Sequence, residues 1–396
     1  MYESIRKNLF CAVYENALKD WLINEGREIF VPFLSKKEVK NTLKIYDEKG
    51  WLDIPKIIDC AEKNEINFIF IIGARRTGKT YGVFKHFIED VFPSKKGIIY
   101  MRRTTTQLDS VLVDKKNPWI DINRDMGRNI FFKKVKGDKD RVVIAEKIYQ
   151  DTDGEAIEYR GEALSLTSMY NNRGFSGSEF SEGIYDEFIP EKMAKRMNGE
   201  ADAFLNAVET ISSNRELQGK KPFRWWLLSN SNTLDNPIVN AFGLLPYLEK
   251  MQKRGQEFSL LKNKGIMLIL INRSPISEKK STTALYRALS NDSDFSRMAL
   301  KNEFAYDDTS CISSEDIRQY KLICTIGKIG IYEHKSECKL YIAEHVSGSC
   351  KDNYEKSEKG ISQFKTFYSW VDNYRLTDRI SYQNLAVKFF IDNIFK

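Results

Sequence analysis

Histidines and closely spaced cysteines, which commonly build metal and disulfide sites, are scarce in this sequence. The 396 residues include three histidines, and the six cysteines form no C-x-x-C pair. Scattered cysteines with so few histidines argue against a structural zinc site or a disulfide framework. We therefore expect reduced thiols and a protein that works inside a cell.

Long apolar runs are also missing. No stretch approaches the roughly 18 uninterrupted apolar residues of a membrane-spanning helix, and the first ten residues, MYESIRKNLF, lack a signal-peptide pattern. We therefore expect no membrane contact. The net charge of +7 is compatible with a polyanionic partner, but it is too small to identify one.

The hydrophobic pattern divides the chain into four segments. Residues 1–64 have the apolar spacing of helices and predict a helical extension. Short apolar strands alternate with helical segments over 65–272, which is typical of an α/β domain with a mainly parallel sheet. Residues 273–310 predict a polar linker with a short helix. Residues 311–396 predict a small α+β domain, in which three closely spaced strands precede helices.

The second segment contains five predicted strands and an insertion. The strands are expected at residues 66–72, 98–101, 183–185, 224–229 and 266–271. The insertion, roughly 129–168, has a sequence pattern typical of antiparallel hairpins and is rich in lysine and arginine. Its lysines Lys133, Lys134 and Lys136 are candidates for contacts to a nucleic-acid backbone, which require cations more than geometry. A solvated hairpin face explains them equally well.

A phosphate-binding loop follows the first of these strands. The sequence GARRTGKT matches the pattern G-x-x-x-x-G-K-[ST], in which backbone N–H groups and a helix N-terminus point at phosphate oxygens. Lys79 is expected to reach the β- and γ-phosphates, and the Thr80 hydroxyl to ligate Mg²⁺. The predicted nucleotide-binding residues are Gly73, Ala74, Arg75, Arg76, Thr77, Gly78, Lys79 and Thr80.

Acidic and amide side chains follow two further predicted strands. Hydrolysis of a triphosphate needs a carboxylate for the metal and a group that orients water. Asp186 and Glu187, after the strand at 183–185, are assigned to these two roles. Asn230, after the strand at 224–229, is a candidate sensor of the γ-phosphate, although asparagine is also an ordinary turn residue. Arg173 and Arg215 are candidates for the arginine that a neighbouring subunit supplies to the γ-phosphate, against the simpler possibility of surface charges.

Several of these motifs together resemble one family. GARRTGKT, IIYMRR, YDEF, NRE, LSN and Asn236-Pro237 are similar, in order and spacing, to the DNA-encapsidation ATPases of small tailed phages that replicate by protein priming, the picovirinae type. The resemblance covers residues 66–396 and is stronger before residue 272. It implies a P-loop NTPase of the additional-strand, conserved-glutamate type, related to terminases, joined to a C-terminal domain of RNase H-like type.

The resemblance also implies a set of partners. The expected activity is hydrolysis of ATP with Mg²⁺, coupled to translocation of double-stranded DNA. The expected assembly is a homomeric ring, usually of five subunits, docked on the portal (connector) of a procapsid through a packaging RNA. Such a motor works in the host cell cytoplasm, transiently on the procapsid vertex.

Residue roles follow from the same likeness. The family's trans-acting arginine falls on Arg215 or on Ser213, and another basic position that acts on the neighbour's nucleotide falls on Arg173. Arg102 and Arg103 lie close to the family's pore-facing DNA contacts. Cys324 and Thr325 stand in the strand that supplies a metal-binding aspartate in RNase H-like nucleases, so we expect no nuclease activity.

Other functions fit parts of the sequence. A terminase large subunit would both translocate and cut DNA. A nucleotide-gated binding module would use the same loop without sustained turnover, but it would not need Glu187. A small-molecule kinase would leave the last 120 or so residues unexplained, and no N-K-x-D segment supports a GTPase.

Overall fold

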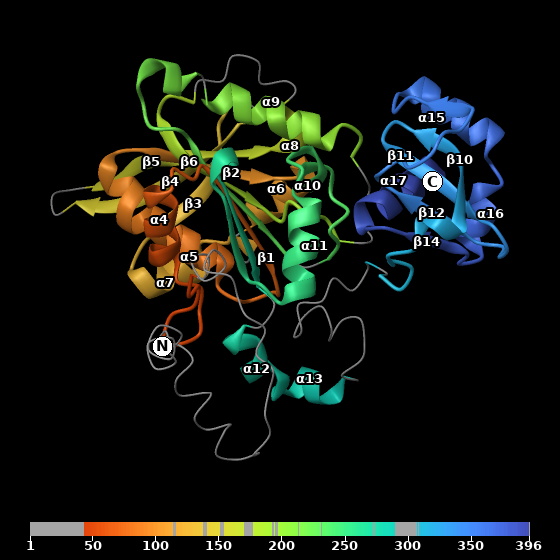
Figure 1. Cartoon of the computed structure of the whole chain (residues 1–396). Helices are drawn as coiled ribbons and strands as arrows, with labels where there is room; N and C mark the ends of the chain where they lie inside the picture. The colour runs from red at the N-terminus through yellow and green to blue at the C-terminus, as the bar shows by residue number, and fades with distance from the viewer. Residues whose placement is uncertain are drawn as a thin grey trace, which may run out of the picture. The chain divides into compact units, whose positions relative to one another are not determined.

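A computed structural model describes residues 43–113, 116–137, 141–150, 154–169, 177–191, 194, 197–212, 214–230, 232–271, 274–289, 307 and 309–395. Two β-sheets organise these residues (Figure 1). A nine-stranded sheet is built from strands between Phe68 and Ile271, and a five-stranded sheet from strands between Tyr320 and Tyr382.

The larger sheet has the strand order β3-β4-β5-β2-β6-β7-β1-β9-β8. Six central strands are parallel to one another, namely β5, β2, β6, β7, β1 and β9. The other three, β3, β4 and β8, pair antiparallel with their neighbours. The bounds are β1 Phe68–Gly73, β2 Gly97–Arg102, β3 Ile130–Lys134, β4 Val142–Gln150, β5 Gly154–Ser165, β6 Phe180–Asp186, β7 Arg224–Ser229, β8 Phe258–Leu261 and β9 Ile266–Ile271. The five strands predicted for 65–272 and the mainly parallel sheet are confirmed.

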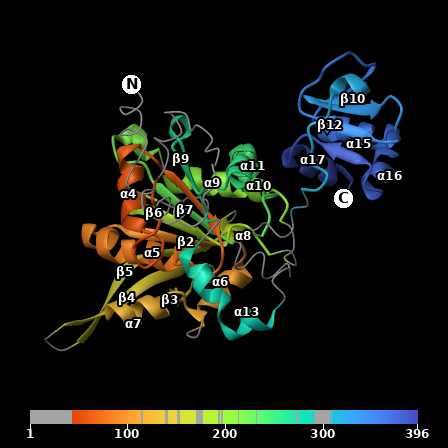
Figure 2. The same ribbon diagram turned by 60° about the horizontal axis from the view of Figure 1, so that its bottom comes forward.

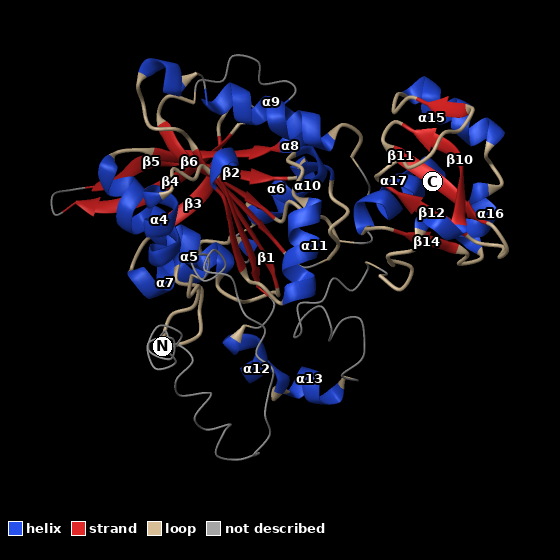
Figure 3. Cartoon of the chain, in the orientation of Figure 1, coloured by secondary structure: helices blue, strands red, loops and turns tan. Residues whose placement is uncertain are grey.

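Most side chains of the central strands are apolar because both faces of the sheet are covered. Along β1, Ile69 and Ile71 belong to one hydrophobic cluster and Phe70 and Ile72 to another, as the alternation of side chains in a strand requires. Helices cover both faces of the sheet (Figure 3) and contribute residues to both clusters. The first cluster includes residues of α4 Ile54–Lys63, α5 Lys79–His86, α6 Thr105–Val111 and α7 Ile120–Met126. The second includes residues of α8 Leu166–Met169, α9 Glu200–Ser212, α10 Pro237–Ala241 and α11 Leu245–Arg254.

The cation-rich insertion forms the antiparallel end of the sheet. β3 pairs with β4, and β4 pairs with β5, so the predicted hairpins are confirmed. β5 also pairs in parallel with β2, which joins the hairpins to the central sheet. The β4–β5 hairpin extends beyond the neighbouring strands (Figure 2).

The smaller sheet has the strand order β13-β10-β11-β12-β14. The bounds are β10 Tyr320–Ile326, β11 Ile329–His334, β12 Leu340–Ala343, β13 Asp352–Tyr354 and β14 Ile380–Tyr382, with helices α15 Glu358–Phe367, α16 Val371–Leu376 and α17 Leu385–Phe395. The predicted meander of three strands followed by helices is present as β10, β11 and β12. Two strands were not predicted, β13 and β14, which pair in parallel with β10 and β12; both are only three residues long, which leaves little periodicity to detect.

Between the two sheets the chain forms two short helices, α12 Pro275–Ser281 and α13 Ala284–Ala288. The sequence predicted a linker with one short helix in this region. Within the described part of the chain, no helix has the length and hydropathy needed to cross a membrane.

Candidate active site

The phosphate-binding loop connects the end of β1 at Gly73 to the start of α5 at Lys79. Gly78 precedes the helix with a φ of +86°, in the left-handed region that favours glycine, and no side chain caps the helix. The N–H groups of the first turn therefore remain available to an anion, and the helix dipole favours negative charge there. Ala74, Arg75, Arg76 and Thr77 form the rest of the loop. The eight predicted residues therefore run from the end of β1 through the loop into the start of α5.

Lys79 folds back into this loop. Its Nζ donates hydrogen bonds to the carbonyl oxygens of Gly73 and Ala74, at 2.9 and 2.6 Å. The Thr77 hydroxyl donates to the Ala74 carbonyl at 3.1 Å. The ammonium group is buried, and it lies where the loop turns around it. Lys79 thus places a positive charge beside the backbone donors, as recognition of a phosphate chain requires.

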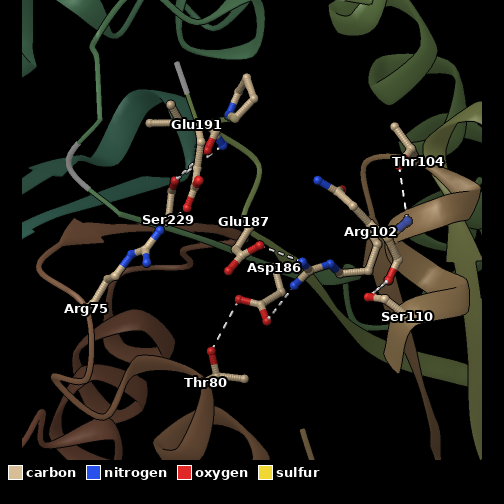
Figure 4. A network of polar contacts seen from close by, with 12 residues as sticks. Arg75, Thr80, Arg102, Thr104, Ser110, Asp186, Glu187, Glu191 and Ser229 are labelled. Carbon is tan, nitrogen blue, oxygen red and sulfur yellow. Dashed lines mark hydrogen bonds and ion pairs between the residues drawn. The ribbon is translucent and has the colours of Figure 1, made fainter. Parts of the chain in front are cut away.

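Asp186 lies at the carboxyl end of β6, next to the first turn of α5. The Thr80 hydroxyl donates a hydrogen bond to Asp186 Oδ1 at 3.2 Å (Figure 4). Parallel pairing with β2 and β7 brings the carboxyl ends of these strands to the same edge of the sheet. Burial raises the pKa of Asp186 above its ordinary value, and the neighbouring Glu187 adds to the rise, although Arg102 opposes it. Its charge is therefore incompletely compensated by the protein.

Glu187 follows directly and has an unusual backbone conformation. Its φ is +57°, which is uncommon for a residue other than glycine and is typical of functional turns. Its side chain is 49% exposed, in contrast to the buried Asp186. The sequence therefore produces two adjacent carboxylates with different environments, one enclosed in the sheet edge and one facing outwards.

Arg102, at the end of β2, contacts both carboxylates. Its guanidinium lies 3.3 Å from Asp186 Oδ2 and 2.5 Å from Glu187 Oε2 (Figure 4). Although burial disfavours the charge, Tyr100 and the two carboxylates raise the pKa of Arg102. Arg102 was predicted to contact DNA, but in this structure its guanidinium is buried in the candidate active site. The signal for this role was the position of Arg102 at the carboxyl end of a strand parallel to β6.

A second arginine links the phosphate loop to the segment after β6. Arg75 forms an ion pair with Glu191 (Figure 4). Ser229, at the end of β7, also contacts the segment after β6, because its hydroxyl accepts a hydrogen bond from the N–H of Ile189 at 3.3 Å. Asn230 follows at the same sheet edge and is partly exposed. The structure thus brings Lys79, Thr80, Asp186, Glu187 and the backbone at Asn230 to one edge of the sheet, and it adds Glu191 to them.

The other predicted arginines lie elsewhere. Arg103 is buried and forms a bidentate ion pair with Glu200, at 2.8 and 3.1 Å. Arg215 is also buried; it donates to the Phe180 carbonyl at 2.8 Å, and its guanidinium lies 5.7 Å from the ring centre of Phe223. Both guanidinium groups are therefore packed inside the protein and not exposed at its surface. Arg173 and Ser213 lie outside the described residues.

Arg215 is also far from its own nucleotide loop. Phe180 begins β6 and Asp186 ends it, and a strand rises about 3.3 Å per residue. Arg215 therefore lies near the end of the strand opposite to Asp186. Burial lowers the pKa of Arg215, as expected for a cation packed into the protein.

The hairpin lysines are on the surface. Lys133, Lys134 and Lys136 are exposed, and Lys134 forms an ion pair with Asp109 at 2.7 Å. They remain the predicted cations that a polyanion can reach, because Arg102 and Arg103 are buried.

The five-stranded sheet has no comparable gathering of acids. Burial raises the pKa of the Cys324 thiol to about 12, so this residue is a neutral neighbour of Asp352 on β13. The Thr325 hydroxyl donates to Asn353 Oδ1 at 2.8 Å. Among the described residues, no group of three or more histidines, cysteines, aspartates or glutamates is arranged to hold a metal ion. Asp352 was missed by the sequence analysis because β13 is too short to stand out.

Comparison with known proteins identifies a family and related chains. The family described as Podovirus DNA encapsidation protein (Gp16) matches residues 55–394. The DNA packaging protein of Bacillus phage B103 is 26% identical over 311 residues, 76% of this chain and 86% of that protein. The DNA packaging protein of Bacillus phage phi29 is 24% identical over 312 residues, 78% of this chain and 84% of that protein.

Solved structures share the fold. A chain from the bacteriophage Phi-29 viral genome packaging motor assembly aligns with a TM-score of 0.58 and 18% identity, covering 85% of this chain and 97% of that one. A chain from the Phi-28 gp11 DNA packaging motor aligns with a TM-score of 0.56 and 17% identity, covering 88% and 97%. The family resemblance inferred from the sequence motifs is confirmed.

Proposed function

Because the chain belongs to the Podovirus DNA encapsidation protein (Gp16) family, we propose that it is an ATP-driven motor that moves double-stranded DNA into a viral procapsid. The observation that carries the proposal is the contact between Thr80 and Asp186, with Glu187 directly adjacent. This contact joins the phosphate loop to the carboxylates that triphosphate hydrolysis requires.

The residues at this contact fit a magnesium ion. Mg²⁺ prefers oxygen ligands and usually keeps several waters, using one or two protein groups. The Thr80 hydroxyl and the Asp186 carboxylate are two such oxygen groups, 3.2 Å apart. Arg102 already provides a cation beside Asp186 Oδ2, which indicates that the pocket favours positive charge. When bound, Mg²⁺ would neutralise charge on the β- and γ-phosphates.

The remaining roles follow from position and charge. Lys79 binds the β- and γ-phosphates from inside the loop, and the backbone N–H groups at the N-terminus of α5 bind them as well. Glu187, exposed and next to Asp186, accepts a hydrogen bond from the attacking water and orients it. Before substrate arrives, Arg102 holds the Glu187 carboxylate, so binding of the phosphates has to compete with this ion pair. Asn230 senses the γ-phosphate at the same sheet edge.

An arginine supplied by a neighbouring subunit completes this proposed site. Arg215 would have to give up its bond to the Phe180 carbonyl and leave a buried position to serve in this way. We therefore assign the trans role to Arg173, with Arg215 holding the start of β6 in place. Such a site requires a ring, and we propose the homomeric ring of five subunits that the family resemblance implies.

The proposed partners follow from the same function. Double-stranded DNA contacts Lys133, Lys134 and Lys136, whose exposed ammonium groups suit a phosphate backbone. The ring docks on the procapsid portal through a packaging RNA, in the host cell cytoplasm. The C-terminal sheet serves docking rather than cleavage, because neutral Cys324 stands beside Asp352 where a nuclease needs a second carboxylate.

The test is steady-state ATP hydrolysis by the purified full chain, with and without double-stranded DNA, at low and moderate salt. We expect DNA to stimulate turnover and salt to weaken the stimulation. Glu187→Gln is expected to reduce turnover by at least about 100-fold while nucleotide still binds, since a positioned general base contributes that much.

Two outcomes would contradict the proposal. Turnover that ignores DNA, even after assembly on procapsids, would favour a nucleotide-gated binding module. Cleavage of DNA by the chain with a divalent metal would favour a terminase large subunit. Glu209→Gln serves as the matched control for Glu187→Gln, because it makes the same change to an exposed carboxylate on α9 that has no proposed role in binding nucleotide or DNA.

A further inference from the structure

A large aromatic side chain lies open beside the phosphate loop. Trp51 is 41% exposed, whereas its apolar neighbours Ile45, Leu52 and Ile54 are 2%, 7% and 2% exposed. These neighbours pack into the cluster beneath β1. The core therefore accounts for the segment around Trp51 but not for the indole itself.

The indole meets the loop at Gly78, directly before Lys79. A β-carbon added to Gly78 would lie 3.1 Å from Trp51 Cε3, and 3.9 Å from each of its bonded neighbours Cδ2 and Cζ3. Contact through the ring face would make these three distances nearly equal. The longer distances to both neighbours mean that the edge of the six-membered ring points at Gly78. The two faces of the ring consequently do not contact Gly78.

Two glycines of this region, four residues apart, allow the approach. A β-carbon on Gly82 would lie 2.6 Å from Ile54 Cγ1, as one on Gly78 would lie 3.1 Å from Trp51. Residues four apart share a helix face, so residues 51–54 run along the first turn of α5. The same turn carries the backbone N–H groups that face the phosphates. Because Trp51 contacts Gly78 at the start of this turn, the indole lies next to the site of a bound nucleotide.

The backbone of Trp51 is held firmly. Asp47 Oδ1 accepts the N–H groups of Lys49 and Trp51, both at 2.9 Å, and the Trp51 carbonyl accepts the N–H of Asp47 at 2.8 Å. Tyr46 and Leu52 form an antiparallel bridge around this turn. The indole is thus supported by a closed turn, and little conformational freedom is lost when a ligand stacks on it.

We propose that Trp51 is the stacking platform for the base of the nucleotide whose phosphates bind at residues 73–80. This inference rests on the proposed nucleotide binding and adds the position of the base to it. A flat, partly exposed indole next to a phosphate site suits any purine ring, because every base has a π-face. Trp51 therefore strengthens the binding of nucleoside triphosphates over that of inorganic polyphosphates, without selecting adenine over guanine.

Calorimetric titration of the full chain tests the inference with three ligands: a non-hydrolysable ATP analogue, the matching GTP analogue and inorganic tripolyphosphate. Stacking of a base contributes enough that Trp51→Ala is expected to weaken both analogues about tenfold. Tripolyphosphate binding should be unchanged, since it has no base. Trp51→Phe, which retains a ring, should stay within about threefold of the wild type.

Fluorescence provides a second readout. Of the described tryptophans, Trp51 and Trp370 are the two that are not buried. Nucleotide is expected to quench the wild-type emission, and the quenching should vanish in Trp51→Phe but persist in the matched control Trp370→Phe. Quenching that persists in Trp51→Phe would overturn the inference.

The calorimetric outcomes separate the inference from the proposed function. Unchanged analogue binding in Trp51→Ala would overturn the stacking role alone. Equal weakening of tripolyphosphate and the analogues would also overturn it, because the indole would then act by supporting the loop. Failure of the wild type to bind any of the three ligands would overturn the proposed function, and this inference with it.

Discussion

Strand β6 carries two buried carboxylates, and the protein treats them in opposite ways. Glu182, near its start, is surrounded by donors: His86 Nε2 lies at 3.1 Å, Arg224 NH1 at 3.0 Å and Trp226 Nε1 at 2.7 Å. Burial alone would raise the pKa of Glu182, but these partners lower it below its ordinary value.

Asp186, at the other end of the strand, is less well compensated. It has the Thr80 hydroxyl at 3.2 Å and Arg102 at 3.3 Å, and Arg102 is shared with Glu187. Burial raises the pKa of Asp186. A carboxylate whose charge is fully compensated by hydrogen bonds and ion pairs contributes to stability, whereas one that is incompletely compensated retains affinity for a further cation. The contrast within one strand therefore distinguishes a structural charge from a functional one.

The largest expected effect is on stability. Glu182→Ala should lower the free energy of unfolding by about 3–5 kcal/mol, because it leaves buried cations without their partner. Asp186→Ala should change it by less than about 1 kcal/mol, since Arg102 keeps Glu187 and Thr80 can bond to water. Urea unfolding without nucleotide measures both. Equal losses would show that the two ends of β6 are equivalent and would break the comparison.

The gain in stability from nucleotide should depend on Asp186 and not on Glu182. A ligand at 100 times its Kd stabilises the folded state by about 2.7 kcal/mol. Asp186→Asn is expected to lose the part of this gain that depends on Mg²⁺, and Glu182→Gln to keep it. Unfolding with ATP plus Mg²⁺, compared with ATP plus a chelator, measures the difference. A magnesium-dependent gain that survives in Asp186→Asn would remove Asp186 from the metal site.

The smallest effect is on pH dependence, and the two residues should differ in sign. The folded-state pKa of Glu182 is lowered, so its contribution to stability is present above about pH 4.3 and is lost as pH falls through the folded pKa. The folded-state pKa of Asp186 is raised, so its contribution is present below about pH 3.9 and is lost as pH rises through the folded pKa.

Stability curves of the wild type against Glu182→Gln and Asp186→Asn, recorded across this acid range, test the signs. The wild type should gain stability over Glu182→Gln as pH rises, and should lose stability relative to Asp186→Asn. Parallel curves for the two pairs would mean that the environments of the two carboxylates do not differ as described.

The arginines show where sequence reasoning stops. Arg102, Arg103 and Arg215 carry the same charge, and the resemblance to the family assigned the first two to DNA contacts and the third to a neighbouring subunit. In the fold, Arg102 bridges Asp186 and Glu187, Arg103 pairs with Glu200, and Arg215 bonds to a backbone carbonyl. Their partners are between 35 and 97 residues away in the chain, and no local pattern encodes such contacts.

Features that depend on adjacent residues could be predicted from the sequence. The phosphate loop from Gly73 to Thr80 depends on adjacent residues, because glycine conformation and helix start are properties of a short segment. The strand before Asn230 was found because buried parallel strands are often continuously apolar, whereas the strand before Asp186 was recognised only over its short end at 183–185. Since the carboxyl ends of parallel strands meet at one edge, the order of motifs was enough to place these residues together.

Which charged groups have all their partners and which do not depends on the folded arrangement of the chain. The lowered pKa of Glu182, the raised pKa of Asp186 and the exposure of Trp51 all depend on residues brought in from other strands and turns. Electrostatic and packing energies depend on distance in space and on burial, and neither quantity can be read from spacing along the chain.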